Sequence, residues 1–227
     1  MKLRIVGCGL QIGVRHLLVP AVLLAGWLCG IGTVAAAQTE MIDRVLAVVA
    51  GDLITLSDVN ACRELGLLAG VQPASPTSEV LPRLIDRALM LAEVERYAPP
   101  EPAAASVDRQ VQLAKSRFAT TQAFEAVLAR VGYDERHLRE TVRQDLRLAA
   151  YLDQRFTVPP PSQDDLGRYY REHPDRFAEG GQLAPFDEAR PRVLEALVGE
   201  RRQRLVSDWV AGLRKRAEIS DMSDPRQ

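Results

Sequence analysis

Cysteine, histidine and aromatic residues are scarce in this sequence of 227 residues. It contains three cysteines and three histidines, and Phe, Trp and Tyr together make up 5% of it. His137 and His173 are isolated from cysteine and from each other, so neither has the spacing typical of a metal site. We expect both histidines to be surface or hydrogen-bonded side chains, and we expect a core built mainly from Leu, Val and Ala.

Motifs for nucleotides and for nucleophilic catalysis are also absent. The sequence has no phosphate-binding loop, no dinucleotide fingerprint and no Gly-x-Ser-x-Gly. Acidic residues are numerous, but they alternate with arginine, as in Glu135-Arg136 and Glu200-Arg201-Arg202, which is typical of solvated helix faces. Since no pair of carboxylates stands out as an acid–base pair, the sequence predicts a non-enzymatic protein without catalytic residues, cofactor or metal.

The N-terminus has the pattern of a secretory leader. Basic residues without any acidic one precede an apolar run over Leu17–Ala25. The later stretch Val34–Gln38 places small residues at the positions that a signal peptidase reads. We therefore expect residues 1–37 to be a signal peptide, cleaved between Ala37 and Gln38, and a mature protein located in the periplasm.

Two other interpretations of the leader are an uncleaved membrane anchor and a lipoprotein signal. One proline and three glycines interrupt the apolar segment, which falls short of the about 20 continuous residues that a spanning helix needs. Cys8 precedes the apolar run, and Cys29 follows the bulky Trp27 and Leu28, so neither cysteine suits lipidation. We expect no stable membrane span after cleavage.

Cleavage would change both the charge and the cysteine content. It removes three basic residues from 29 and none of the 30 acidic residues, so the mature 190 residues carry 26 against 30, a net charge of −4. A mildly acidic, exported chain gives no reason to expect a nucleic-acid partner. Only Cys62 remains, which excludes an internal disulfide, and we expect it to be a small buried residue.

The mature chain begins with the pattern of a small β-hairpin. Val45–Val49 and Leu53–Thr55 are apolar runs on either side of a turn that contains glycine. Two strands alone are marginally stable, so Ala217–Ile219 is a candidate third strand. Thr55 or Ser57 is expected to cap the helix that follows.

Helical periodicity dominates the remainder of the chain, and the fold class predicted is mainly α. The expected helices are Asp58–Leu68, Glu79–Tyr97, Val107–Phe118, a helix from Thr120 or Thr121 to Gly132, one from Asp134 to Phe156, Gln163–Glu172 and Phe186–Arg216. Pro82 is expected in the first turn of its helix, and Pro191 near the start of the last helix or at a kink in it.

Two apolar stripes are expected on the longest of these helices. In the helix after Asp134 the stripe consists of Leu138, Val142, Leu146, Ala149 and Leu152. In the last helix it consists of Leu194, Leu197, Leu205, Trp209 and Leu213. The last helix carries a basic stretch from Arg201 to Arg204 and the run Arg214-Lys215-Arg216. We interpret both as its solvent face, with contact to anionic lipid or an acidic client as the alternative.

Prolines and glycines divide the mature chain. Val158–Ser162 contains three prolines and is predicted to be a stiff linker, while Phe177–Pro185 is predicted to be a loop. The expected domain, residues 38–220, comprises a hairpin and helical core at 38–157, a linker and short helix at 158–185, and a last helix with its candidate strand at 186–220. Residues 221–227 form a tail.

The order of these segments resembles the SurA-type periplasmic chaperones. The resemblance is carried by Ile42–Val49 with Gly51–Val59, by Leu84–Met90, by Leu138–Leu146, by Tyr169-Tyr170 with His173-Pro174 and Phe177, and by Phe186–Ala189. It implies a SurA N-terminal-like domain whose C-terminal helix packs back on the early helices. It also implies clients that are unfolded outer-membrane or secreted proteins, held without ATP.

The chain departs from this family at one position. Many relatives insert a parvulin-type prolyl isomerase domain of roughly 90 residues, but here only Ala178–Ala184 separates Phe177 from Pro185. Prolyl isomerisation is therefore the weaker alternative, and a structural or assembly subunit bound to one envelope protein is another. No client-binding residue is assigned, since Phe118, Tyr133 and Tyr169 are as typical of a core, and a homodimer formed by exchange of the last helix stays open.

Overall fold

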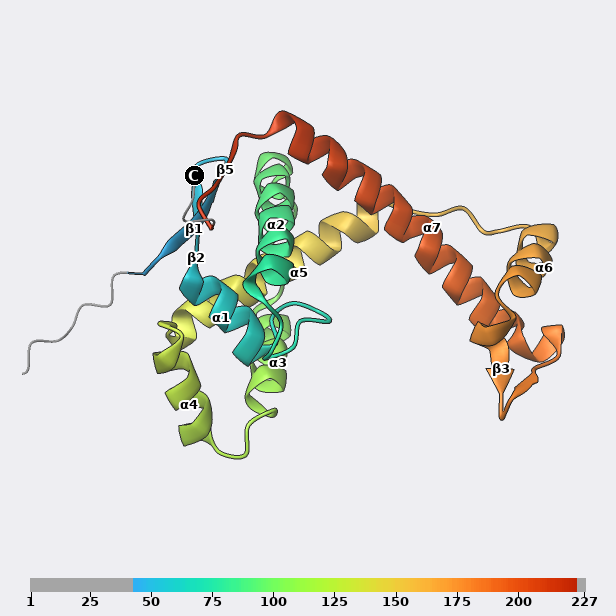
Figure 1. Cartoon of the computed structure of the whole chain (residues 1–227), viewed down its shortest axis with the longest axis horizontal. Coiled ribbons are helices and arrows are strands. Elements are labelled where there is room, and N and C mark those ends of the chain that lie inside the picture. The colour runs from blue at the N-terminus through green and yellow to red at the C-terminus, as the bar shows by residue number, and fades with distance from the viewer. Residues whose placement is uncertain (1–42, 224–227) are drawn as a thin grey trace, which may run out of the picture. The chain divides into compact units, whose positions relative to one another are not determined.

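The computed structural model describes residues 43–223. The predicted signal peptide, with its cleavage site between Ala37 and Gln38, lies outside the described residues, as does most of the predicted tail. The mainly α fold class is confirmed. The helices are α1 (Leu56–Leu65), α2 (Thr77–Tyr97), α3 (Ala104–Lys115), α4 (Thr121–Arg130), α5 (Glu135–Arg155), α6 (Gln163–Glu172) and α7 (Phe186–Arg216) (Figure 1).

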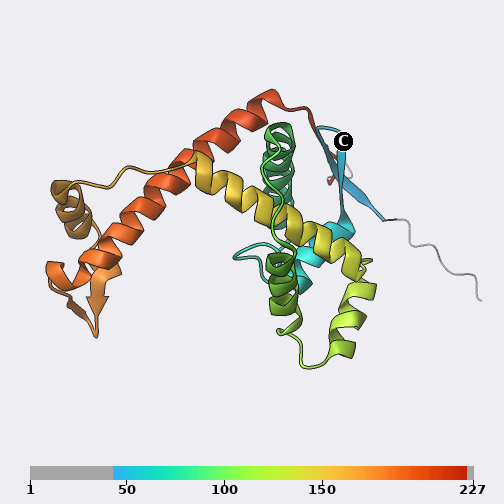
Figure 2. The same cartoon turned by 180° about the vertical axis from the view of Figure 1, so that it is seen from behind.

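A three-stranded antiparallel sheet begins and ends the described chain. Strands β1 (Val45–Val49) and β2 (Asp52–Thr55) form the predicted hairpin, and β5 (Ile219–Asp221) pairs with β1, so the order is β2-β1-β5 (Figure 2). The third strand is thus confirmed, two residues later than expected. The reason is that the N–H of Ala217 still bonds the carbonyl of Leu213, at 3.0 Å, and so closes α7.

Helix caps explain where several helices begin. The side chain of Thr55 accepts the N–H of Asp58, that of Asp134 accepts the N–H of His137, and that of Ser162 accepts the N–H of Asp165. Of the two candidates for the first cap, Thr55 is the right one.

Several predicted bounds are wrong by two or three residues. Helix α1 ends at Leu65, not Leu68, because Gly66 adopts the left-handed conformation with φ 63°. Helix α2 starts at Thr77, which places Pro82 in its second turn, not its first. The carbonyl that Pro82 leaves without a donor belongs to Ser78, an exposed residue. Helix α3 lies three residues earlier than expected.

The segment between α5 and α7 is part linker and part structure. Residues 156–162 have no regular structure, as the prolines predicted. The predicted loop at 177–185 is wrong: the short 3₁₀ helix Pro174–Phe177 leads into a hairpin of β3 (Ala178–Glu179) and β4 (Gln182–Leu183). Gly180 and Gly181 make this turn with φ 59° and 83°, a conformation that glycine adopts without cost.

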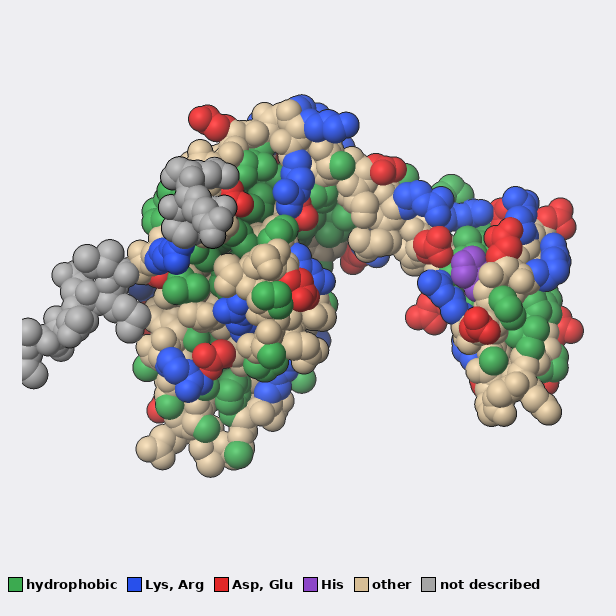
Figure 3. Space-filling view, in the orientation of Figure 1, with side chains coloured by type: hydrophobic (Ala, Val, Ile, Leu, Met, Phe, Trp, Pro, Cys, Tyr) green, Lys and Arg blue, Asp and Glu red, His purple; other side chains and the backbone are tan. Residues whose placement is uncertain are grey.

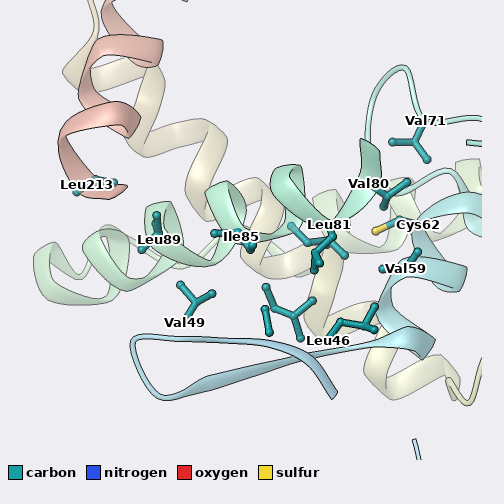
Figure 4. Close-up of a cluster of buried hydrophobic side chains, with 13 residues drawn as sticks. Leu46, Val49, Val59, Cys62, Val71, Val80, Leu81, Ile85, Leu89 and Leu213 are labelled. Carbon is teal, nitrogen blue, oxygen red and sulfur yellow. The ribbon is translucent and has the colours of Figure 1, made fainter. Parts of the chain in front are cut away.

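The main core lies between the hairpin and α2. Leu46 and Val49 of β1 point toward Leu81, Ile85 and Leu89 of α2 (Figure 4). Leu213 of α7 joins the same cluster, and Arg214 Nε donates to Asp86 Oδ1 of α2 at 2.5 Å. The expectation that the last helix packs back on the early helices is confirmed.

The predicted apolar stripe of α5 is wrong at Ala149, while its other four members pack in buried clusters. Leu138 and Val142 are buried against α1, α3 and α4, but Ala149 is exposed and Leu148 and Tyr151 are buried in its place. The buried side rotates because the end of α5 leaves α3 and α4. It packs instead in a second cluster with Val94 of α2 and Trp209 of α7.

The predicted stripe of α7 is confirmed at Leu197, Trp209 and Leu213 and is wrong at its other two positions. Leu194 and Leu205 are 41% and 45% exposed, whereas Val193 and Val210 are buried. The first half of α7 packs with α6 and the 3₁₀ helix in a separate cluster, here called the α6–α7 cluster. Its buried members are Leu166, Tyr169, Phe177, Ala184, Ala189, Val193 and Leu197.

Candidate polypeptide-binding clefts

Three hollows surround the first two thirds of α5. The widest has a volume of about 1140 Å³ and lies between the start of α3, the end of α4 and the start of α5. Its apolar lining includes Pro102, Val107 and Ala129, while Arg136 and Arg139 are among the charged residues around it. A lining that mixes apolar and charged side chains suits a segment that carries both kinds.

The second hollow, here called the β2–α2 cleft, has a volume of about 330 Å³ and lies between β2, α2 and α5. Its lining includes aliphatic side chains from β2, α2 and the loop after α1: Leu53, Ile54, Leu67, Leu68, Leu84, Ala88, Leu91 and Ala92. A volume at the low end of the range for small-molecule sites can hold one or a few side chains, not a folded domain.

The third hollow has a volume of about 600 Å³ and lies between the end of α1, α3 and α5. Leu113, Ala114 and Leu146 line it, and Leu113 is 55% exposed. Leu67 lines both this hollow and the β2–α2 cleft, so the two are neighbours across the loop that follows α1.

Tyr133 lies between the wide hollow and the β2–α2 cleft and lines both. Its hydroxyl donates to Asp58 Oδ1 at 2.9 Å, and its ring stacks on His137 with centroids 3.9 Å apart. The other carboxylate oxygen of Asp58 accepts the N–H of Thr55 at 2.8 Å. Burial raises the pKa of Tyr133, so the hydroxyl remains a neutral donor and holds the ring in place.

Arg87 and Asp145 join α2 to α5 beside the cleft. Arg87 Nε donates to Asp145 Oδ1 at 2.7 Å, and Arg87 Nη2 lies 3.4 Å from both the Thr141 carbonyl and Gln144 Oε1. Burial raises the pKa of Asp145, an effect that the charge of Arg87 opposes. These polar groups bond one another and share the lining of the cleft about equally with the aliphatic residues.

Cys62 also lines the β2–α2 cleft, but it is not an activated nucleophile. Its side chain is buried, as the sequence predicted, and burial raises the pKa of its thiol to about 12. A thiol with so high a pKa is almost entirely protonated at neutral pH, and the thiolate is the reactive form.

The two histidines of the described chain take part in stacking and hydrogen bonding. His173 Nδ1 lies 3.0 Å from the carbonyl of Tyr169, and His137 stacks on Tyr133. Over residues 43–223, no group of three or more His, Cys, Asp or Glu side chains is arranged to hold a metal ion. Within the same residues, no helix is both long enough and apolar enough to cross a bilayer.

The arginines in the middle of α7 form ion pairs with neighbouring elements. Arg201 reaches Asp165 of α6 at 3.1 Å, and Arg202 pairs with Asp153 of α5. Basic and acidic side chains are interspersed over α6 and the first half of α7 (Figure 3). This mixture favours the interpretation of these arginines as part of a solvated helix face, and it disfavours a continuous anion-binding surface.

Sequence reasoning missed the leucines that line the hollows. Leu53 is 60% exposed although it lies in a strand, and Leu67 lies in the loop where a helix had been expected. Of the three aromatic residues considered for a groove, Tyr133 lines two hollows, while Tyr169 is buried in the α6–α7 cluster and Phe118 packs against Phe124. Alternation in β2 is the one sequence signal that marks Leu53, because Ile54 must then face the core.

Comparison with models of protein families finds no match, and comparison with curated proteins finds none either. Among solved structures, the chain is similar to one described for PEB4 and Cj1289 of the human pathogen Campylobacter jejuni. PEB4 is a virulence factor and Cj1289 a periplasmic protein, and the two are structurally related SurA-like chaperones. The identity is 15% and the TM-score 0.49, over 80% of this chain and 100% of that chain.

Proposed function

We propose that this chain is an ATP-independent periplasmic chaperone that holds unfolded polypeptides, such as outer-membrane proteins, until they fold or are handed on. The secretory leader at residues 1–37 supports export, with cleavage between Ala37 and Gln38. The resemblance of successive segments to SurA-type chaperones supports the kind of activity.

The observation that carries this proposal is the β2–α2 cleft, with its neighbours around α5. Leu53, Leu67 and Leu91 offer an aliphatic surface in a hollow of about 330 Å³ that lies open beside an exposed strand. An unfolded chain exposes apolar side chains, and small open hollows bind such side chains weakly. Weak binding permits release without nucleotide hydrolysis.

Two further observations favour holding over catalysis. The hairpin between the 3₁₀ helix and α7 spans Ala178–Leu183, which leaves no room there for an isomerase domain. The cysteine of the cleft is kept protonated by burial, so it supplies no nucleophile.

The proposal is tested by light scattering from a chemically unfolded porin diluted into buffer with residues 38–227. We expect suppression of aggregation at near-stoichiometric ratios. Failure to suppress it, with the protein shown to be folded by circular dichroism, contradicts the proposal. Recovery of one stoichiometric folded partner from an envelope extract would then favour an assembly subunit.

Two exposed leucines provide a matched pair of variants. Leu113→Asp places a charge in the third hollow, where the side chain is 55% exposed. Leu183→Asp places the same charge on β4, where the side chain is 46% exposed and lines none of the three hollows. We expect the first variant to suppress aggregation less than the parent and the second to match it. Equal activity of the two variants removes the third hollow from the client surface.

A further inference from the structure

Within residues 43–223, the main-chain groups of Leu53 at the outer edge of β2 have no hydrogen-bond partner. Alternate residues of β1 bond β5, since the carbonyl of Leu46 accepts from Met222 and the N–H of Ala50 donates to Glu218. Val48 lies between them in this alternation and therefore also faces β5. Its partner across β2 is Leu53, so the N–H and C=O of Leu53 face away from β1.

No strand of the described chain lies beyond β2, because the sheet order is β2-β1-β5. The next residue with the same orientation is Thr55, and its N–H already donates to Asp58 Oδ2 at 2.8 Å. Leu53 is therefore the one position of β2 that presents both a donor and an acceptor at this edge, and its side chain is 60% exposed.

The same edge forms a wall of the β2–α2 cleft. Asp52, Leu53 and Ile54 all line this cleft. Successive side chains of a strand point to opposite faces of the sheet, so a hollow on one face alone would contact only every second residue. Since three consecutive residues line this cleft, the cleft lies along the edge of β2. The free main-chain groups of Leu53 thus lie beside the aliphatic surface of α2.

We propose that an extended segment of an unfolded client adds to β2 as a fourth strand and bonds the N–H and C=O of Leu53. Its apolar side chains enter the β2–α2 cleft. This inference rests on the proposed chaperone function and names the mode of recognition. Main-chain pairing reads no sequence, so it suits a protein that must hold many different chains.

The dimensions of the edge favour a client over a second copy of the chain. Strand β2 has four residues, and one of them supplies both main-chain groups. Stable protein interfaces bury on the order of 1,200–2,000 Å², far more than pairing along so short a strand provides. A short contact made and broken readily is what holding without ATP requires.

Amide exchange followed by NMR tests the pairing without any variant. The probe is a short peptide of alternating valine and threonine flanked by lysines, added to residues 38–227. We expect the N–H of Leu53 to exchange rapidly in the free protein and at least tenfold more slowly with peptide, because a new hydrogen bond protects it. The N–H of Ile54, which faces β1, should be protected in both states.

Three results overturn the inference. One is a Leu53 amide that stays unprotected while the peptide binds elsewhere. Another is protection in the free protein that grows with its own concentration, which assigns the edge to a second copy. The third is concentration-independent protection in the free protein, which assigns it to a segment of the chain itself.

Proline variants on the two edge strands give a matched comparison. Leu53→Pro removes the outward N–H without breaking the ladder to β1, and edge strands tolerate proline in that orientation. Asp221→Pro does the same on β5, which lines none of the three hollows. We expect Leu53→Pro to bind the peptide about fivefold more weakly, as for the loss of one hydrogen bond, and Asp221→Pro to bind like the parent.

Porin aggregation separates this inference from the proposed function. If the parent suppresses aggregation and Leu53→Pro is equally active with unchanged peptide affinity, strand addition is wrong while the chaperone proposal stands. If the parent does not suppress aggregation, the proposed function itself fails.

Discussion

The two halves of α7 belong to different cores although they form one continuous helix. The first half buries Ala189, Val193 and Leu197 with α6, whereas the second half buries Leu213 against α2 and packs Trp209 on Tyr151 of α5. Val193 and Leu213 are 20 residues apart in the sequence, which at 3.6 residues per turn places them on nearly opposite sides of the helix. A helix that serves two cores therefore shows no single apolar face.

Between the two halves α7 is largely exposed. Gly199, Gln203 and Arg204 are exposed, and no residue of the α6–α7 cluster belongs to another buried cluster. Apart from the linker at 156–162, α7 is the covalent connection between this cluster and the rest of the described chain. We therefore expect the two cores to unfold with separate stabilities, which the following variants test.

Phe177→Ala should have the largest effect. Its ring is 2% exposed in the α6–α7 cluster. Removing such a buried ring lowers the free energy of unfolding by about 3–5 kcal/mol. Hydrogen exchange with mass spectrometry should show lost protection over residues 163–200, while α1 to α5 remain protected. Leu183→Ala, at an exposed side chain of the same segment, is the control with little effect. Uniform loss of protection along the chain would show that the two cores unfold as one.

Trp209→Ala should weaken the other half. Its ring lies 5.3 Å from Phe156 and 5.9 Å from Tyr151, and the guanidinium of Arg155 lies 5.9 Å from it. The side chain is half-buried, so we expect a loss of about 2–3 kcal/mol, less than for a full cavity. Urea unfolding should show the lower stability, with protection lost at the end of α5 while the α6–α7 cluster is spared. Trp209→Phe should recover part of the loss.

Gly199→Ala should sharpen the comparison by stiffening the connection. An added Cβ at Gly199 meets no atom within 4 Å, and alanine is about 1 kcal/mol more favourable than glycine inside a helix. We expect a gain of about 0.5–1 kcal/mol and slower amide exchange around position 199. Gly66→Ala is the opposite case, because φ there is 63° and the new Cβ would lie 1.9 Å from Arg117 Nη1. A loss of stability in Gly199→Ala would show that the middle of α7 packs against another part of the protein.

Local signals in the sequence predicted the elements, and tertiary packing decided their faces. The caps at Thr55, Asp134 and Ser162 and the bounds of α7 follow from neighbouring residues alone. The buried sides of α5 and α7 do not, because each helix changes partner along its length. For the candidate site, the strand that carries Leu53 was predictable. The cleft beside it was not, since it depends on how α2 and α5 approach β2.

Acid should separate the two cores further, by a smaller effect. A hydrogen bond from Arg201, and others from Ser162, lower the pKa of Asp165 below 3.8 in the folded state. A carboxyl whose pKa is lowered by folding stabilises the folded state at a pH above its unfolded-state pKa. This stabilisation is lost as the pH falls through its folded-state pKa. Burial raises the pKa of Asp145 in the other core, which has the opposite sign: its contribution is present at low pH and lost as the pH rises through its folded pKa.

We therefore expect acidification from about pH 6 to about pH 3 to reduce amide protection in α6 and the first half of α7 before it reduces protection around Asp145. Asp165→Asn keeps an acceptor oxygen for Ser162 and Arg201 but cannot titrate. In this variant the amide protection of α6 should therefore change less over the same pH range. The measurement is exchange at matched intrinsic rates at each pH. An equal acid response of the parent and Asp165→Asn would mean that other carboxylates, such as Glu200 with its lowered pKa, carry the effect.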